Sequence, residues 1–150
     1  MDLRPFRLGD PAIAPLLADL AAEYEALYGP TDEMTAADET EFDPPSGLFL
    51  AVVEERVVIA GGGFRYLAPG VCEVKRMWTH RSHRGQGHAS AVLRALEEEA
   101  RAAGYTVVRL ETGPAQPTAA ALYASRGYRR IPAYGRYRAA IAFERSLVES

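Results

Sequence analysis

The sequence predicts an α/β fold, with a mixed, mostly antiparallel sheet of about six to seven strands flanked by helices, in a single domain over residues 1–150. Two runs rich in Val, Ile and Phe, at 48–53 and 56–66, are separated only by Glu54 and Glu55, which is typical of a β-hairpin. Further along, the apolar spacing changes from a strand pattern to a helical pattern and back. This change predicts one strand-turn-helix-strand crossover.

The first elements are a short extended segment at 3–7 and a long helix. Asp10 and Pro11 supply an N-cap and a first-turn proline, and Gly29 with Pro30 ends the helix. Apolar residues recur with helical spacing along one face: Ile13, Leu16, Leu17, Leu20, Tyr24, Leu27 and Tyr28. The acidic stretch 31–43 then predicts a loop with one helical turn. Its carboxylates either are simply solvated or attract a cationic acceptor.

A third strand is predicted at 71–79, after the hairpin. Alternation places Val74 and Trp78 on one face, and the other face carries Glu73, Lys75 and Met77. Arg76 interrupts the apolar face, which indicates a bulge, a strand end or a functional side chain. In the preceding strand, the three consecutive glycines at 61–63 are expected to weaken the strand.

The second half of the chain alternates helices and strands. A helix is predicted from Ala89 to Ala103, ended by Gly104, and a strand at 105–112. A further helix begins at Gln116 and Pro117 and is closed by Gly127. Two last strands are expected at 128–131 and 139–147.

Composition excludes several classes of protein. The formal net charge of −3 argues against a general nucleic-acid binder. The apolar runs fall far short of the roughly 18 residues that a membrane span needs, and the N-terminus lacks the apolar region of a signal peptide, so a cytoplasmic protein without membrane contact is expected. Cys72 is the only cysteine, which excludes an internal disulfide. Its place in the apolar alternation of a strand predicts a buried hydrophobe and not an acyl-carrying nucleophile.

The turn Arg84-Gly85-Gln86-Gly87-His88-Ala89 joins a predicted strand to a predicted helix. Such a turn presents free backbone N–H groups and the positive end of a helix dipole, which together bind phosphate. It is not a P-loop, because no Gly-Lys-Ser/Thr follows. A dinucleotide-binding turn is disfavoured because Ser90 stands where the third glycine belongs and no doubly wound repeat follows.

These residues resemble the acetyl-CoA signature of the GCN5-related N-acetyltransferase (GNAT) family, Gln/Arg-x-x-Gly-x-Gly/Ala, at every fixed position. The preceding strand, Glu73 to Thr79, and a later block from Glu111 through Gln116 and Tyr123 to Tyr128 are also similar to the family. The resemblance covers nearly the whole chain. It implies binding of acetyl-CoA as a co-substrate and transfer of its acetyl group to an amine.

The resemblance also implies which residues hold the coenzyme. The pantetheine arm is expected along Met77, Trp78 and Thr79, and the pyrophosphate on the amides of the turn, with Arg84 at its start. Gln116 stands seven residues before Tyr123, where the family commonly has an asparagine. The expected cofactor-binding residues are therefore Met77, Trp78, Thr79, Arg84, Gly85, Gln86, Gly87, His88, Ala89, Gln116 and Tyr123.

The implied reaction is direct attack of a neutral amine on the thioester in a ternary complex. Tyr123 is expected to act as the acid for the departing thiolate and Glu73 as the base, with Glu111 or a water chain as the rival base. Metal is not expected, because His80, His83 and His88 lie across a loop without a carboxylate.

The acceptor is expected to be a small-molecule amine or a peptide N-terminus, with no nucleic-acid partner, and the resemblance leaves a homodimer open. A polar aromatic loop at 134–137 and side chains from the first half of the chain are expected to shape its pocket: Tyr24, Tyr28, Arg65 and Tyr66. The alternative function is a catalytically idle acyl-CoA sensor of the same fold.

Overall fold

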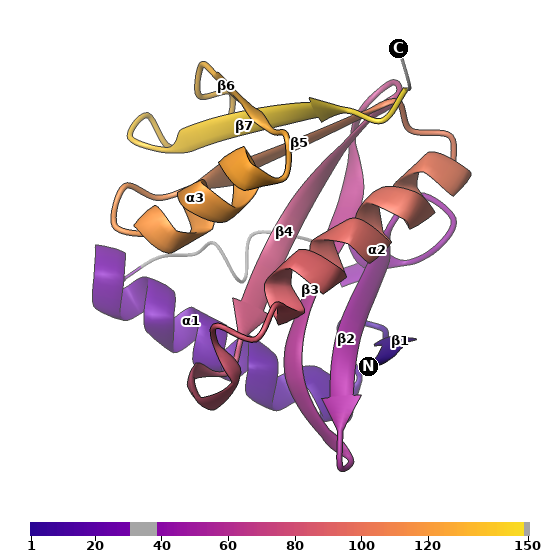
Figure 1. The fold of residues 1–150 in the computed structure, drawn as a ribbon, viewed down its shortest axis with the longest axis vertical. Helices are drawn as coiled ribbons and strands as arrows, with labels where there is room; N and C mark the ends of the chain where they lie inside the picture. Colours follow the sequence, from indigo (N-terminus) through magenta and orange to yellow (C-terminus); the bar gives the residue numbers. More distant parts are fainter. Residues whose placement is uncertain (31–38, 149–150) are drawn as a thin grey trace.

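The computed structural model describes residues 1–30 and 39–148, and it confirms the predicted α/β class (Figure 1). Seven strands form one mixed sheet in the order β1-β2-β3-β4-β5-β7-β6, in which only β4 and β5 are parallel neighbours. The strands are β1 (Asp2–Pro5), β2 (Leu48–Glu54), β3 (Val57–Ala68), β4 (Val71–Thr79), β5 (Val107–Thr112), β6 (Arg129–Ile131) and β7 (Ile141–Ser146). The helices are α1 (Ala14–Tyr28), α2 (His88–Ala102) and α3 (Pro117–Ser125), with short 3-10 turns at Pro11–Ile13, Glu39–Phe42 and Arg81–His83.

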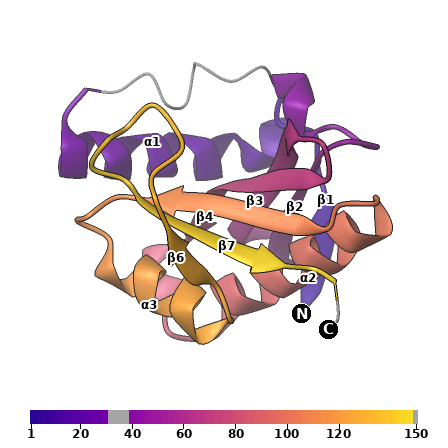
Figure 2. The same cartoon turned by 90° about the horizontal axis from the view of Figure 1, so that it is seen from above.

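The two faces of the sheet are covered by different helices. Figure 2 shows α1 on one face, and α2 and α3 on the other. Each face has its own hydrophobic cluster, one built around Leu93, Leu96 and Phe143 and the other around Leu16, Leu20 and Phe49. No helix among the described residues is both long and apolar enough to cross a membrane.

The local signals read from the first half of the chain are confirmed in detail. The Asp10 carboxylate accepts a hydrogen bond from the amide of Ala12, and α1 ends at Gly29, whose φ is 79°. The hairpin of β2 and β3 turns at Glu55 and Arg56, which both have positive φ. The predicted helical turn within 31–43 is the 3-10 turn at Glu39–Phe42, and the other acidic residues of that stretch, at 31–38, lie outside the described residues.

The three glycines coincide with an irregular part of β3: the register to β4 shifts between Gly61 and Gly63, as expected of a weakened strand, while the pairing with β2 continues through all three. The strand runs without interruption through 61–63, because the glycines make room for neighbours that pack directly on the backbone. A Cβ at Gly62 would lie 2.3 Å from the sulfur of Met77, and one at Gly63 would lie 2.7 Å from the ring of Phe42. Close packing at these positions is possible only because glycine has no side chain.

A buried ionic cluster joins the second half of the chain into one unit. Glu97 on α2 is only 3% exposed, and its carboxylate accepts hydrogen bonds from Arg126 and Arg145, each at 2.6 Å, and from the hydroxyl of Tyr128 at 2.8 Å. Burial and the neighbouring carboxylate raise the pKa of Tyr128. Glu97 therefore connects α2 to the end of α3 and to β7.

We predict that Glu97→Gln lowers the free energy of unfolding by ~3 kcal/mol, because it leaves two partly buried arginines without the buried carboxylate that they share. Glu98→Gln is the matched control. Its side chain is 63% exposed and lies 3.7 Å from Arg94 on the helix surface, so we expect a change below ~0.5 kcal/mol. Urea unfolding of both variants measures the difference, and equal losses would contradict the role of the cluster.

Candidate functional site

The two parallel strands at the centre of the sheet separate soon after they meet. Their ladder holds three residue pairs, from Val71 with Val107 to Glu73 with Arg109. Beyond that point β4 continues to Thr79 beside β3, and β5 continues to Thr112 beside β7, and Figure 1 shows the two strands diverging. The diverging segments, which we call the splay, present backbone groups toward each other with no ladder between them.

A β-bulge at Arg76 accompanies the splay. Arg76 has a φ of 63°, and the register between β3 and β4 shifts between Gly61 and Gly63. Of the three explanations left open for this arginine, the structure shows the bulge. The extra residue reverses the alternation that follows it. The prediction that Val74 and Trp78 share a face is therefore wrong: Val74 packs on the α2 side and Trp78 on the α1 side.

The predicted coenzyme-binding strand segment uses its side chains within the fold. Met77 packs against Gly62, and the indole N–H of Trp78 donates to Asp19 on α1 at 2.7 Å. The carbonyl oxygen of Thr79 accepts from Arg84 Nε at 3.2 Å. What remains for a ligand in the splay is therefore mainly the backbone of 77–79.

The glycine turn has the geometry of an anion site. Gly85 and Gly87 have φ values of 77° and 84°, which only glycine adopts readily, and a Cβ at either position would meet nothing within 4 Å. Gly87 is the N-cap of α2, and no side chain caps that helix end. Its first amides are therefore available to an external acceptor.

Two acidic residues of α1 fasten this turn to the rest of the molecule. Arg84 forms an ion pair with Glu23, and Arg81 lies 3.6 Å from Asp19. Both arginine side chains are more than half exposed, so these pairs can rearrange at little cost. The guanidinium of Arg84 thus holds the start of the turn against α1.

The three histidines of this region come together around the turn. Ring centroids of His80 and His83 lie 6.0 Å apart, and those of His83 and His88 lie 6.1 Å apart. The amide of Ser82 donates to Nδ1 of His80, and His88 Nε2 lies 3.2 Å from the side-chain oxygen of Gln86. Among residues 1–30 and 39–148, no group of three potential ligands is placed to hold a metal ion.

Gln116 contacts a residue that the sequence assigned only loosely to the acceptor pocket. Its side-chain oxygen accepts from the hydroxyl of Tyr28 at 2.9 Å, from Thr112 at 3.2 Å and from the amide of Gly113 at 3.0 Å. The ring of Tyr28 fills the space where a Cβ of Gly113 would stand, 1.9 Å from its hydroxyl oxygen. The end of α1 is thereby joined to the turn between β5 and α3.

Tyr123 lies in the core between α3 and the sheet. It is 5% exposed, and its ring packs against those of Tyr128 and Phe143, with centroids 5.9 and 5.7 Å away. Burial, and secondarily the neighbouring phenol of Tyr24, raises the pKa of Tyr123. The hydroxyl therefore keeps its proton at neutral pH and is a hydrogen-bond donor.

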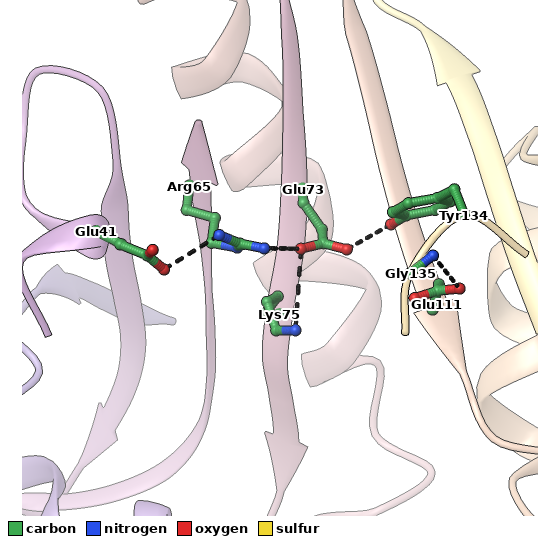
Figure 3. A network of polar contacts seen from close by, with 7 residues as sticks. All are labelled: Glu41, Arg65, Glu73, Lys75, Glu111, Tyr134 and Gly135. Atoms are coloured by element: carbon green, nitrogen blue, oxygen red, sulfur yellow. Dashed lines mark hydrogen bonds and ion pairs between the residues drawn. The ribbon is translucent and has the colours of Figure 1, made fainter. Parts of the chain in front are cut away.

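Glu73 is the centre of a polar network on the α1 face of the sheet (Figure 3). One carboxylate oxygen accepts from Arg65 Nε at 3.0 Å and Nη2 at 2.8 Å, with Lys75 at 3.9 Å, and the other accepts from Tyr134 at 2.6 Å. Arg65 also reaches Glu41 at 3.2 Å. Both oxygens of Glu73 are committed to neighbours.

The network raises the pKa of both of its donors, Arg65 and Tyr134. Burial alone would lower the pKa of Arg65, but Glu73 and Glu41 more than offset it and raise that pKa. Burial and then Glu73 raise the pKa of Tyr134. Arg65 stays charged and Tyr134 stays protonated, so the carboxylate of Glu73 keeps its donors.

Glu111 lies on the same face, on the other arm of the splay. One of its oxygens accepts the amide of Gly135 at 3.3 Å, and a Cβ at Gly135 would lie 2.2 Å from the other. Arg109, two residues earlier, stacks over the ring of Tyr134 at 5.8 Å and donates to Glu144. The loop at 132–140 is thus held to β4 through Glu73 and to β5 through Glu111.

Sequence reasoning named most of these residues without their contacts. Arg65 and Tyr134 were placed near an acceptor by position only, and the hydrogen bond between Tyr134 and Glu73 joins residues 61 positions apart.

Cys72 is fully buried as expected, and burial raises the pKa of its thiol to about 12, which leaves it protonated and unreactive.

Comparison with known proteins places the chain in a family. The model of the acetyltransferase (GNAT) family matches residues 14–128. The chain belongs to the GNAT family. An IAA acetyltransferase of Azospirillum brasilense is 32% identical over 127 residues, covering 84% of this chain and 82% of that protein. The uncharacterized N-acetyltransferase YjgM of Escherichia coli K12 is 31% identical, covering 81% and 77%.

Solved structures agree with this family. A candidate acyl-CoA N-acyltransferase of Klebsiella pneumoniae has a TM-score of 0.81 at 28% identity and covers 97% of both chains. An aminoglycoside 6'-N-acetyltransferase complexed with coenzyme A has a TM-score of 0.76 at 14% identity, covering 100% of this GNAT protein and 99% of that chain. The second likeness concerns the fold alone.

Proposed function

We propose that this GNAT protein is an N-acetyltransferase that moves the acetyl group of acetyl-CoA directly to a primary amine in a ternary complex. The observation that carries the proposal is the placement of the uncapped glycine turn at the end of the splayed strand β4. A phosphate site and an open strand edge then lie along one path, as a ligand with a pyrophosphate and a long amide-bearing arm requires.

The residues present fit coenzyme A. The backbone at Gly85 and Gly87 is open to a bulky anion, and the amides at the start of α2 supply donors for the pyrophosphate. The pantetheine arm carries amide groups, which can pair with the backbone of 77–79 as an added strand does. Two acetyltransferases that share the fold are complexed with coenzyme A, which supports its use by this protein.

The reaction breaks the C–S bond of the thioester and forms a C–N bond. The amine must first lose one proton, and after attack the nitrogen loses a second while the thiolate gains one. In our proposal Tyr123 donates to the departing sulfur, since its raised pKa keeps it protonated. The match of Tyr123 to the tyrosine of the family's later sequence block supports this role.

To choose the base that deprotonates the amine, we compare the two glutamates on the α1 face of the sheet. Glu73 has both oxygens occupied by Arg65 and Tyr134, which favours a positioning role. Glu111 accepts one backbone amide, at 3.3 Å. We therefore assign deprotonation of the incoming ammonium to Glu111, directly or through water, and give Glu73 the task of holding Tyr134 and Arg65.

Binding of coenzyme A tests the turn. We expect Gly87→Glu to abolish binding in isothermal titration calorimetry, because the new carboxylate repels the pyrophosphate and occupies its place. Gly104→Glu is the matched control: it also has a positive φ and open space, but at the other end of α2. Retained affinity in Gly87→Glu, or equal loss in both variants, would show that the phosphates bind elsewhere.

Release of free coenzyme A tests the transfer. We expect the wild type to release it from acetyl-CoA faster when amines are added, and Tyr123→Phe to lower kcat about 100-fold with little change in the KM for acetyl-CoA. Tyr105→Phe is the control, because it removes a buried hydroxyl that donates to Ser46 and lies outside the proposed site. An unchanged kcat in Tyr123→Phe would remove the acid role. Binding of acetyl-CoA without stimulation by any amine would instead support the sensor.

A further inference from the structure

We propose that Tyr28 is a positioning residue for the coenzyme: its phenol holds the side chain of Gln116 so that the amide nitrogen of Gln116 faces the pantetheine arm. This inference rests on the proposed binding of coenzyme A and adds a residue of α1 to that site. Tyr28 is the last residue of α1, and Figures 1 and 2 show this end of the helix beside the turn that leads from β5 to α3.

The side-chain amide of Gln116 is held in one orientation. One of its two terminal atoms lies 2.9 Å from the hydroxyl of Tyr28, 3.2 Å from that of Thr112 and 3.0 Å from the backbone nitrogen of Gly113. Because a backbone N–H can only donate, this atom is the oxygen. The amide nitrogen, with its two N–H donors, stands on the other side, and no residue that the structure describes accepts from it.

The register of the sheet brings this amide to the level of the proposed pantetheine segment. β4 and β5 are parallel, and their ladder ends at the pair Glu73 with Arg109. Four residues further on, β4 enters the segment 77–79 and the chain after β5 enters the turn 113–116. The bulge in β4 shifts this count by one residue and leaves the two segments across the splay from each other. A ligand along 77–79 therefore has Gln116 on its other side.

Tyr28 reaches Gln116 because residue 113 is a glycine. A Cβ at Gly113 would lie 1.9 Å from the phenol oxygen of Tyr28 and 2.3 Å from the ring carbon that bears it. The φ of Gly113 lies outside the left-handed region, so space for the ring, and not backbone freedom, requires the glycine. Burial raises the pKa of Tyr28, and a hydrogen bond from the backbone of Ala115 offsets this only in part. The hydroxyl therefore stays protonated and donates to Gln116.

The phenol adds to Gln116 the one contact that comes from outside its own turn. Thr112 and Gly113 lie within four residues of Gln116, whereas Tyr28 lies 88 positions away. A glutamine that is already held in one rotamer loses less conformational freedom when a ligand binds to it. Tyr28 thereby favours binding of the pantetheine arm without touching it.

Two ligands distinguish positioning from a general effect on the fold. Coenzyme A carries the pantetheine arm, and 3'-phospho-ADP is its nucleotide part without that arm. We expect Tyr28→Phe to raise the Kd for coenzyme A about fivefold, as loss of a neutral hydrogen bond does, and to change the Kd for 3'-phospho-ADP less than about twofold. Gly113→Ala should act in the same way, since its methyl group displaces the ring. Tyr105→Phe, the control, should change neither Kd.

A double variant tests whether Tyr28 acts through Gln116. Once Gln116→Ala has removed the group that is positioned, Tyr28→Phe should have no further effect on the Kd for coenzyme A. Additive effects of the two changes, an unchanged Kd for coenzyme A in Tyr28→Phe, or an equal loss for both ligands would overturn the inference. A wild type that binds no coenzyme A would instead contradict the proposed function.

Discussion

The short parallel ladder between β4 and β5 is the constraint on which the rest of the site depends. Three residue pairs bring the strands together, and the bulge at Arg76 then leads β4 away while β5 follows β7. Buried backbone groups without a ladder partner are costly unless another group satisfies them. In the proposed function, the amide groups of the pantetheine arm would supply the missing partners along the splay.

Side-chain contacts hold the two arms at a fixed separation. On the α1 face, Glu73 and Glu111 hold one loop from opposite strands, through Tyr134 and Gly135. On the other face, Glu97 gathers α2, α3 and β7 around a buried carboxylate. These contacts preorganise the positions that acyl transfer needs, so little reorganisation is left for the reacting complex.

Local rules predicted the elements well, and long-range contacts lay beyond them. Asp10, Gly29 and Gly87 mark helix ends through their own backbone chemistry, which sequence reveals. The bulge reversed the facing of Trp78, because a period of two cannot show where an extra residue enters a strand. The close packing at the three glycines of β3 could not be predicted for a similar reason, since the residues that need their space come from other elements.

The same limit applied to the site: features carried by consecutive residues were predicted, and contacts between distant segments were not. The glycine turn was recognisable because its function is carried by consecutive residues, while the insertion of Tyr28 against Gly113 joins segments that no local pattern connects. The competing roles of Glu73 and Glu111 were also undecidable from sequence, because both are glutamates on predicted strands. Only their neighbours, Arg65 and Tyr134 for one and a backbone amide for the other, separate them.

Amide hydrogen exchange with and without coenzyme A tests most directly whether the splay is the coenzyme site. The account predicts that amides of 77–79 and of the turn at 84–89 exchange more slowly when coenzyme A is bound, because the ligand supplies their missing partners. Strand β2, which is already paired on both sides by β1 and β3, should not change. Binding that leaves 77–79 unprotected, or that protects only residues outside the splay and the turn, would contradict it.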